Sequence, residues 1–288
     1  MRDLDRIAQP WGSRTPYAEG TEWPRRQDMF LADGVAEADV DSWVQSASVL
    51  HSNGDAMDIA VKDGRIVGVR GRVGDRVNHG RLGPKDLFGW QANHSADRLT
   101  RPLIRQDGKL VETDWDTAMD LIVQRTQDLV AEQGPGALGF YTTGQLFLEE
   151  YYTLTTAVRG GLSCNHLDGN TRLCTATSGE ALKETFGADG QPGSYTDVDH
   201  ADTIALYGHN VAETQTVLWM RILDRLDGPN PPRLLVVDPR QTKVADRATV
   251  HLRPLPGTNV ALLNCLLQQV IANDWVDHDF VAARTVGF

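Results

Sequence analysis

The sequence has 288 residues, enough to bury one large core or two smaller ones. It is 41% hydrophobic and 23% charged, the balance of a globular protein, and its formal net charge of −11 excludes ordinary nucleic-acid binding. No apolar run approaches the length of a membrane span, so neither nucleic acid nor membrane is an expected partner. Three cysteines are too few for a disulfide framework, which favours the cytoplasm.

Residues 1–40 are rich in proline, glycine and charge, which predicts an irregular N-terminal arm. The arm contains a twin-arginine pair, Arg25-Arg26, but the apolar stretch after it is too short for an export signal. We therefore interpret the arm as mature sequence. Residues 57–61 and 65–69 then flank Asp63-Gly64, a strong β-hairpin signal. The hairpin indicates a small β-rich domain over residues 41–110.

From residue 111 the pattern changes to alternating helices and strands. Asp114 is a candidate N-cap of a helix that Gly134 ends. A short strand is expected at 137–142, buried strands at 203–207 and 234–237, and helices at 146–158 and 212–226. Strand–helix–strand spacing of this kind predicts an α/β fold, with a doubly wound, largely parallel sheet over residues 111–288.

The segment Gly134–Gly139 matches a dinucleotide-binding pattern, but it lies at the end of a helix instead of at the start of one, so we interpret it as a helix stop and a turn. Better candidates are the loops 208–213, 238–240 and 256–259, each of which follows a strand or precedes a helix. Open α/β sheets bind ligands at the carboxyl ends of their strands. Asp238 would bind sugar hydroxyls and Arg240 phosphate, and Thr258 is a candidate helix cap.

Two cysteines have different settings. Cys174 lies in a polar segment beside Arg172, which would favour a thiolate, the form that binds soft metals. Cys265 lies in the apolar run 260–270 and is expected to be a small buried apolar residue.

A series of short motifs follows the hairpin along the chain: Gly80-Arg81-Leu82-Gly83-Pro84-Lys85, Arg98-Leu99-Thr100-Arg101-Pro102-Leu103, Trp115-Asp116-x-Ala118, Asn170-x-Arg172-x-Cys174, Gly208-x-Asn210-x-Ala212-Glu213, Val237-Asp238-Pro239-Arg240 and Pro256-Gly257-Thr258-Asn259. In these motifs and their order, the sequence from about Trp43 to Phe288 resembles the molybdopterin oxidoreductases. Because no histidine follows Cys174 directly, the sequence is closer to nitrate reductases than to formate dehydrogenases.

The resemblance implies a molybdenum bis(molybdopterin guanine dinucleotide) cofactor. It makes Cys174 the protein ligand of molybdenum and places Lys85 between an iron–sulfur cluster and the pterin. The residues that the resemblance assigns to cofactor binding are Gln145, Asn170, Gly208, Asn210, Glu213, Asp238, Arg240, Gly257, Thr258 and Asn259.

The sequence departs from the family at the four cysteine positions of a 4Fe-4S cluster, which here hold Ser48, His51, Asp55 and Gly83. Serine is rarely ionised and glycine has no ligand atom, so we expect no cluster. A zinc ion held by Ser48, His51 and Asp55 would lack a fourth ligand. Solvated polar residues on a relic loop are the favoured interpretation.

The resemblance implies nitrate reduction by oxygen-atom transfer, with electrons from a donor protein or reductase. Since the family continues well past Phe288, we interpret the chain as an N-terminal portion. It is then a fragment, a truncated chain, or one subunit whose C-terminal part a separate chain supplies. Two other interpretations stay open, a pseudoenzyme that serves as a scaffold or partner module, and a formate dehydrogenase-type oxidoreductase.

Overall fold

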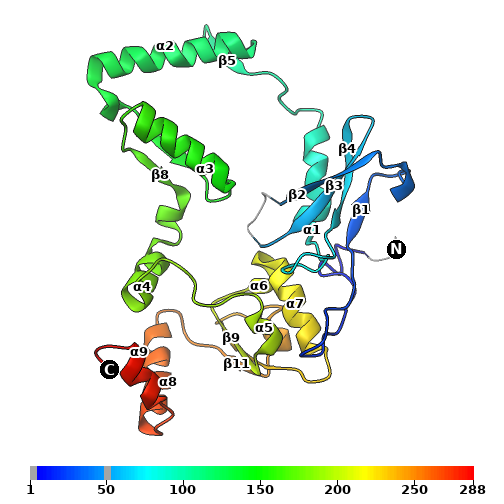
Figure 1. The fold of residues 1–288 in the computed structure, drawn as a ribbon, viewed down its shortest axis with the longest axis vertical. Coiled ribbons are helices and arrows are strands. Elements are labelled where there is room, and N and C mark those ends of the chain that lie inside the picture. Colours follow the sequence, from blue (N-terminus) through cyan, green and yellow to red (C-terminus); the bar gives the residue numbers. More distant parts are fainter. Residues whose placement is uncertain (1–4, 49–52) are drawn as a thin grey trace. The chain divides into compact units, whose positions relative to one another are not determined.

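The computed structural model describes residues 5–48 and 53–288, and Figure 1 labels their helices and strands. The chain divides into two compact units. The first unit comprises the described part of Met1–Thr15 together with Trp23–Asp197. The second comprises Pro16–Glu22 and Val198–Phe288. The division into an arm, a domain over 41–110 and a domain over 111–288 stays a prediction.

An antiparallel sheet of four strands opens the first unit, in the order β1-β4-β3-β2. Its strands are β1 (Met29–Leu31), β2 (Ser42–Ala47), β3 (Ala56–Lys62) and β4 (Arg65–Gly71). The predicted hairpin is confirmed, because β3 pairs with β4 around Asp63 and Gly64. Both turn residues have left-handed φ angles, 51° and 71°, as a two-residue hairpin turn requires.

One face of this sheet carries the core of the first unit. Met57, Val69, Leu82 and Leu87 are buried together, with the Phe30 ring packed against them. Leu87 belongs to the short helix α1 (Pro84–Phe88), and a 3-10 turn, η2 (Gly89–His94), follows it. The loop that leads into α1 is therefore part of the core, although Lys85 within the helix is exposed.

The rest of the first unit alternates helices and short strands. In order they are β5 (Leu103–Gln106), β6 (Lys109–Glu112), α2 (Trp115–Gln133), η3 (Pro135–Ala137), β7 (Phe140–Thr142), α3 (Leu148–Thr155), the π-helical turn η4 (Thr156–Gly161), β8 (Leu167–Gly169), η5 (Asn170–Leu173) and α4 (Ala176–Phe186). β5 and β6 form an antiparallel pair, whereas β7 and β8 are parallel.

The predicted ends of α2 are confirmed. The Asp114 carboxylate accepts a hydrogen bond from the backbone N–H of Thr117 at 2.7 Å, which caps the helix. Gly134, with φ 80°, ends the helix, and its N–H donates to the carbonyl of Val130. Gly134–Gly139 is thus a helix stop followed by a 3-10 turn, as predicted, and not a dinucleotide loop.

The second unit is built on three parallel strands in the order β11-β10-β9. Its elements are α5 (Asp197–His200, which begins one residue earlier), β9 (Thr203–Tyr207), α6 (Val211–Thr214), α7 (Thr216–Leu226), β10 (Arg233–Val237), the 3-10 turn η6 (Ala245–Arg247), β11 (Val250–Leu252), α8 (Asn259–Ala272) and α9 (His278–Arg284). The predicted βαβ unit is confirmed, except that its helix is interrupted at Gln215, between α6 and α7. Within residues 5–48 and 53–288, every helix is too short or too polar to cross a bilayer.

Helix α7 buries charge as well as apolar side chains. Trp219 and Met220 are almost fully buried, and so is Arg221 at 1% exposure. Arg221 donates from Nε and Nη2 to the two carboxylate oxygens of Asp199, at 2.8 and 2.6 Å. Arg225, one turn later, donates to backbone carbonyls, including that of Asn230 at 2.9 Å. These arginines attach α7 to the segment before β9 and to the segment before β10.

Removing Asp199 should therefore destabilise the second unit. In Asp199→Ala the Arg221 guanidinium stays buried without its carboxylate, and we expect a loss of about 3–5 kcal/mol in unfolding free energy, measured by urea titration. The matched control is Asp227→Ala, which breaks the more exposed pair with Arg247 and should cost less than about 1 kcal/mol. Equal losses in the two variants would contradict the structural role of the buried pair.

Candidate functional site

Two of the predicted cofactor loops leave the same edge of the parallel sheet in the second unit. β9 and β10 are parallel neighbours with Tyr207 opposite Val237, and the Gly208 N–H donates to the Val237 carbonyl at 2.7 Å. The Gly208–Glu213 and Asp238–Arg240 loops therefore begin side by side, as the βαβ spacing predicts. Asp238 in turn donates its N–H to the Leu252 carbonyl at the end of β11. The loops that follow the three parallel strands therefore all begin at the same edge of the sheet.

The first loop presents a buried acceptor. Gly208 has φ 61° and open space where a side chain would begin. The Oδ1 atom of Asn210 is buried, and within the described part of the chain it accepts no hydrogen bond. A buried acceptor without a donor is costly, so this atom suits a donor group on a ligand. His209 Nε2 lies 2.6 Å from Gln215 Oε1, which ties the start of the loop to the residue between α6 and α7.

The second loop fixes a carboxylate beside an exposed cation. Asp238 is 7% exposed, and its Oδ1 accepts the backbone N–H of Arg240 at 2.8 Å, an Asx turn. The Asp238 carbonyl lies 2.8 Å from Nε2 of His251. The Arg240 side chain is exposed. The turn thus places a carboxylate and a guanidinium two residues apart at the sheet edge.

The third loop differs from its predicted form. Gly257 has φ 90° with open space around it, and Thr258 precedes α8. Thr258 was predicted to cap the helix, but its side chain makes no capping hydrogen bond. Its hydroxyl donates instead to the Leu255 carbonyl at 2.7 Å. Asn259 begins the helix and is exposed.

In the first unit, a second pair of parallel strands brings other predicted site residues together. Thr142 at the end of β7 lies opposite Gly169 at the end of β8. Beyond these ends, the Asn170 side-chain oxygen accepts the Gly144 N–H at 2.8 Å. Gln145 follows directly and is exposed. The parallel strands therefore place Gln145 and Asn170 on adjoining segments. In the sequence, only the resemblance to the family relates these two residues.

Cys174 lies one turn beyond Asn170, where its backbone N–H donates to the Thr171 carbonyl at 3.2 Å. The cysteine is exposed, so it is not enclosed by aliphatic side chains, as its polar setting predicts. The buried cysteine is Cys164, whose sulfur contacts the Leu138 carbonyl at 3.3 Å. Cys265 was expected to be buried and is exposed on α8, so that prediction was wrong. That Cys174 shares a cleft with Lys85 and with the loops of the second unit stays a prediction.

Arg172 is engaged by a carboxylate that sequence reasoning missed. Its Nε donates to Oδ2 of Asp168 at 3.0 Å. This hydrogen bond, followed by one from the Gly169 amide, lowers the pKa of Asp168 below its ordinary value. The guanidinium that was expected to favour a Cys174 thiolate thus pairs with Asp168, and its effect on Cys174 stays a prediction. The signal available in the sequence was the i, i+4 spacing of the two charges.

The positions that replace the cluster cysteines are not alike. Asp55 is only 2% exposed, which corrects the expectation of solvated side chains on a relic loop. Ser48 is half-buried, and His51 lies outside the described residues. Gly83 is buried, and its N–H donates to Oδ2 of Asp86 at 2.9 Å. In the described ranges, no three His, Cys, Asp or Glu side chains gather in a way that could hold a metal ion.

Comparisons with known proteins identify the family to which the chain belongs. The sequence profile of the family described as Molybdopterin oxidoreductase matches residues 98–280. The chain is 34% identical to a nitrate reductase of Symbiobacterium thermophilum over 85% of its own length and 32% of the relative. It is 32% identical to the F420-dependent formate dehydrogenase subunit alpha of Methanocaldococcus jannaschii over 82% of its own length and 34% of the relative. The chain thus spans about a third of the length of the curated relatives it matches.

The solved structure of acetylene hydratase from Pelobacter acetylenicus has the same fold. It matches with a TM-score of 0.70 and 22% identity over 83% of this chain and 33% of that chain. Because the family profile covers more than half of the chain, the chain belongs to the molybdopterin oxidoreductase family. Membership implies a molybdenum–pterin cofactor. The buried Asn210 oxygen and the open space beside Gly208 and Gly257 fit such a group.

The Asp168–Arg172 pair can be tested by titration. A carboxylate whose pKa is lowered in the folded chain adds stability above its unfolded pKa and loses that contribution as pH falls through the folded pKa. Carboxyl NMR should therefore place the midpoint of Asp168 below the usual aspartate range, and Arg172→Gln should raise it. Lys183→Gln, which removes another exposed pairing cation, serves as control. An unchanged midpoint in Arg172→Gln would rule out the pair as the cause.

Proposed function

We propose that the chain is the N-terminal portion of a cytoplasmic nitrate reductase that uses a molybdenum bis(molybdopterin guanine dinucleotide) cofactor. The observation that carries the proposal is the shared edge of β9 and β10, where the loop with the buried Asn210 oxygen begins beside the Asp238 turn. A guanine or pterin ring offers N–H donors for such an acceptor. The ribose hydroxyls of the dinucleotide suit a carboxylate, and its pyrophosphate suits a guanidinium.

The chain's own residues would divide the task between its two units. In the second unit, Asn210 and Asp238 would accept hydrogen bonds from the nucleotide while Arg240 binds phosphate. The further contacts proposed there come from Gly208, Glu213, Gly257, Thr258 and Asn259. In the first unit, Gln145 and Asn170 would bind the pterin, Cys174 would hold the metal, and Lys85 would adjoin the pterin. The bound molybdenum supplies two-electron oxygen-atom transfer.

We propose nitrate instead of formate as the substrate for two reasons. The residue after Cys174 is Thr175, which is the pattern that resembles nitrate reductases. The nitrate reductase relative is also slightly more similar, at 34% identity against 32% for the formate dehydrogenase. Formate oxidation remains the alternative that the second relative supports. The replaced cluster positions support a third candidate, a scaffold or partner module without redox activity.

We further propose that this segment holds no 4Fe-4S cluster. Two of the four positions, Ser48 and Gly83, offer no thiolate, carboxylate or imidazole. Anaerobically purified protein should contain far less iron than the roughly four atoms per chain of such a cluster. A variant with all four cysteines restored (Ser48→Cys, His51→Cys, Asp55→Cys and Gly83→Cys) is the matched comparison for the assay. About four iron atoms per unmodified chain would refute this part of the proposal.

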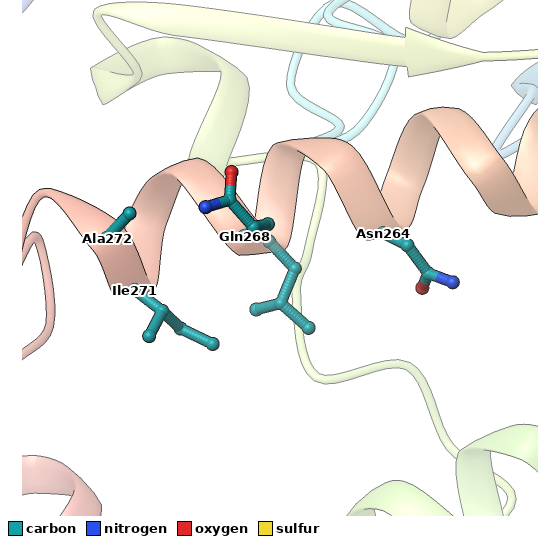
Figure 2. Close-up of a pocket in the computed structure, with 5 residues that line it drawn as sticks. Asn264, Gln268, Ile271 and Ala272 are labelled. Carbon is teal, nitrogen blue, oxygen red and sulfur yellow. The ribbon is translucent and has the colours of Figure 1, made fainter.

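Exposed apolar faces support a partner polypeptide. On α8, Val260, Leu263, Leu267 and Ile271 share one face and are 47–70% exposed. The same helix borders an open hollow of about 300 Å³ lined by Asn264, Leu267, Gln268, Ile271 and Ala272 (Figure 2). Exposed apolar surface of this extent is typical of an interface. We propose that it packs against the polypeptide that supplies the other two thirds of the relatives' length, and that a separate reductase delivers electrons.

Co-expression tests the function and this partner together. The chain should co-purify with the segment of the Symbiobacterium nitrate reductase that lies beyond the matched region. The complex should contain molybdenum and reduce nitrate with a chemical electron donor, but should not oxidise formate. Cys174→Ser should lose molybdenum and activity, whereas Cys265→Ser should keep both. A molybdenum-containing complex that oxidises formate but leaves nitrate unchanged would point to the alternative substrate. A complex without molybdenum would favour the scaffold.

A further inference from the structure

Three charged residues of the N-terminal arm, Arg6, Arg26 and Asp28, form a buried cluster that we call the arginine clamp. Their side chains are 12%, 5% and 10% exposed. The Asp28 carboxylate accepts hydrogen bonds from Nε and Nη2 of Arg26 at 3.0 and 2.9 Å. Nη1 of Arg6 lies 3.3 Å from the same carboxylate. Burial lowers the pKa of Arg6, and the charge of Asp28 opposes that shift. Such a cluster is favourable only when its members are well hydrogen-bonded.

The clamp binds both backbone polar groups of Leu82. The Leu82 N–H donates to Oδ2 of Asp28 at 3.0 Å, and the Leu82 carbonyl accepts from Nη2 of Arg6 at 2.6 Å. Leu82 is fully buried in the core, so these groups have no access to water. The next residues are Gly83, Pro84 and Lys85. The backbone position from which α1 and its exposed lysine start is therefore set by arm side chains 54 and 76 residues away.

The clamp is itself anchored at both ends. Arg26 donates from Nη1 and Nη2 to the carbonyls of Ser13 and Trp11, at 2.7 and 2.6 Å, which joins two parts of the arm. The backbone N–H of Asp28 donates to the Gly80 carbonyl at 2.9 Å. A side chain at Gly80 would begin 1.9 Å from the Arg26 carbonyl, so only glycine permits this approach. The arm and the loop are thus packed backbone against backbone.

We propose that the arginine clamp positions the loop that carries Gly83 and Lys85, so that this loop is fastened by hydrogen bonds from the arm instead of by thiolate–metal bonds. Asp28 is then a positioning residue that acts on Lys85 through Leu82. The fastening follows from the contacts above. Its importance for catalysis rests on the role proposed for Lys85.

Hydrogen exchange followed by mass spectrometry tests the fastening in the full 288-residue chain. Asp28→Asn should accelerate exchange in peptides covering residues 80–88 by at least about tenfold, because the Leu82 N–H loses its charged acceptor and the neighbouring amides then open with it. The matched control is Asp58→Asn, whose carboxylate also pairs with two arginines, Arg70 and Arg72, in the same unit. The control should change exchange at 80–88 by less than about twofold. Unchanged exchange in folded Asp28→Asn overturns the proposal.

Milder variants decide the matter if Asp28→Asn does not fold. Arg6→Gln removes the bond to the Leu82 carbonyl and should accelerate the same peptides. Arg26→Lys keeps the charge but loses the planar fork, so it should act like Arg6→Gln. If neither Arg6→Gln nor Arg26→Lys accelerates exchange in these peptides, the proposal is overturned.

The acylation rate of the Lys85 amine, relative to that of Lys62, gives a readout on the lysine itself. It should change at least about twofold in Arg6→Gln and stay constant in Asp58→Asn, in line with local opening of the loop. An unchanged Lys85 rate despite faster exchange would refute the positioning of the lysine. A chain that shows both effects but never binds molybdenum would refute the proposed function and leave the clamp intact.

Discussion

The parallel pairing of β9 with β10 is the constraint on which the candidate site of the second unit depends. In a parallel pair both strands end on the same edge, so Tyr207 opposite Val237 forces the following loops to start together. The Gly208 N–H donates to a carbonyl of β10 and the Asp238 N–H to a carbonyl of β11. These two hydrogen bonds hold the first residue of each loop in place. Polar side chains such as those of Asn210 and Asp238 gain fixed positions from backbone bonds that are independent of any ligand.

The same geometry recurs in the first unit on a smaller scale. β7 and β8 form a parallel pair of three residues each, and the segments beyond them are joined by the bond between Gly144 and Asn170. Asp168, the middle residue of β8, then holds Arg172 in the following turn, just before Cys174. Apart from Lys85, which lies in α1, the predicted site residues of each unit therefore follow the carboxyl ends of parallel strands, as is common in open α/β sheets.

Arginines that bind backbone carbonyls hold the irregular parts of the chain. Arg225 donates to the carbonyls of Val198, Ala201 and Asn230, and Arg26 donates to those of Trp11 and Ser13. A planar guanidinium with five donors can satisfy several carbonyls at once, which a lysine cannot do in the same geometry. This chemistry suits a chain whose N-terminal arm has little regular structure of its own.

The sequence by itself determined the features that depend on near neighbours. Asp63-Gly64 specified a hairpin because both residues tolerate left-handed backbone, and Asp114 and Gly134 set the ends of α2 through local hydrogen bonds. The βαβ spacing likewise specified parallel strands and the loops at their ends.

Only the tertiary structure decided which polar and apolar groups meet across long distances. Cys265 lies in an apolar run but is exposed, because burial depends on what packs against α8 and not on the run itself. No local pattern in the sequence predicts that Asp55 is only 2% exposed. Nor does any predict that Arg6 contacts Leu82, 76 residues away. Such contacts form only when the whole chain closes, since each requires two distant segments to be placed by their own cores.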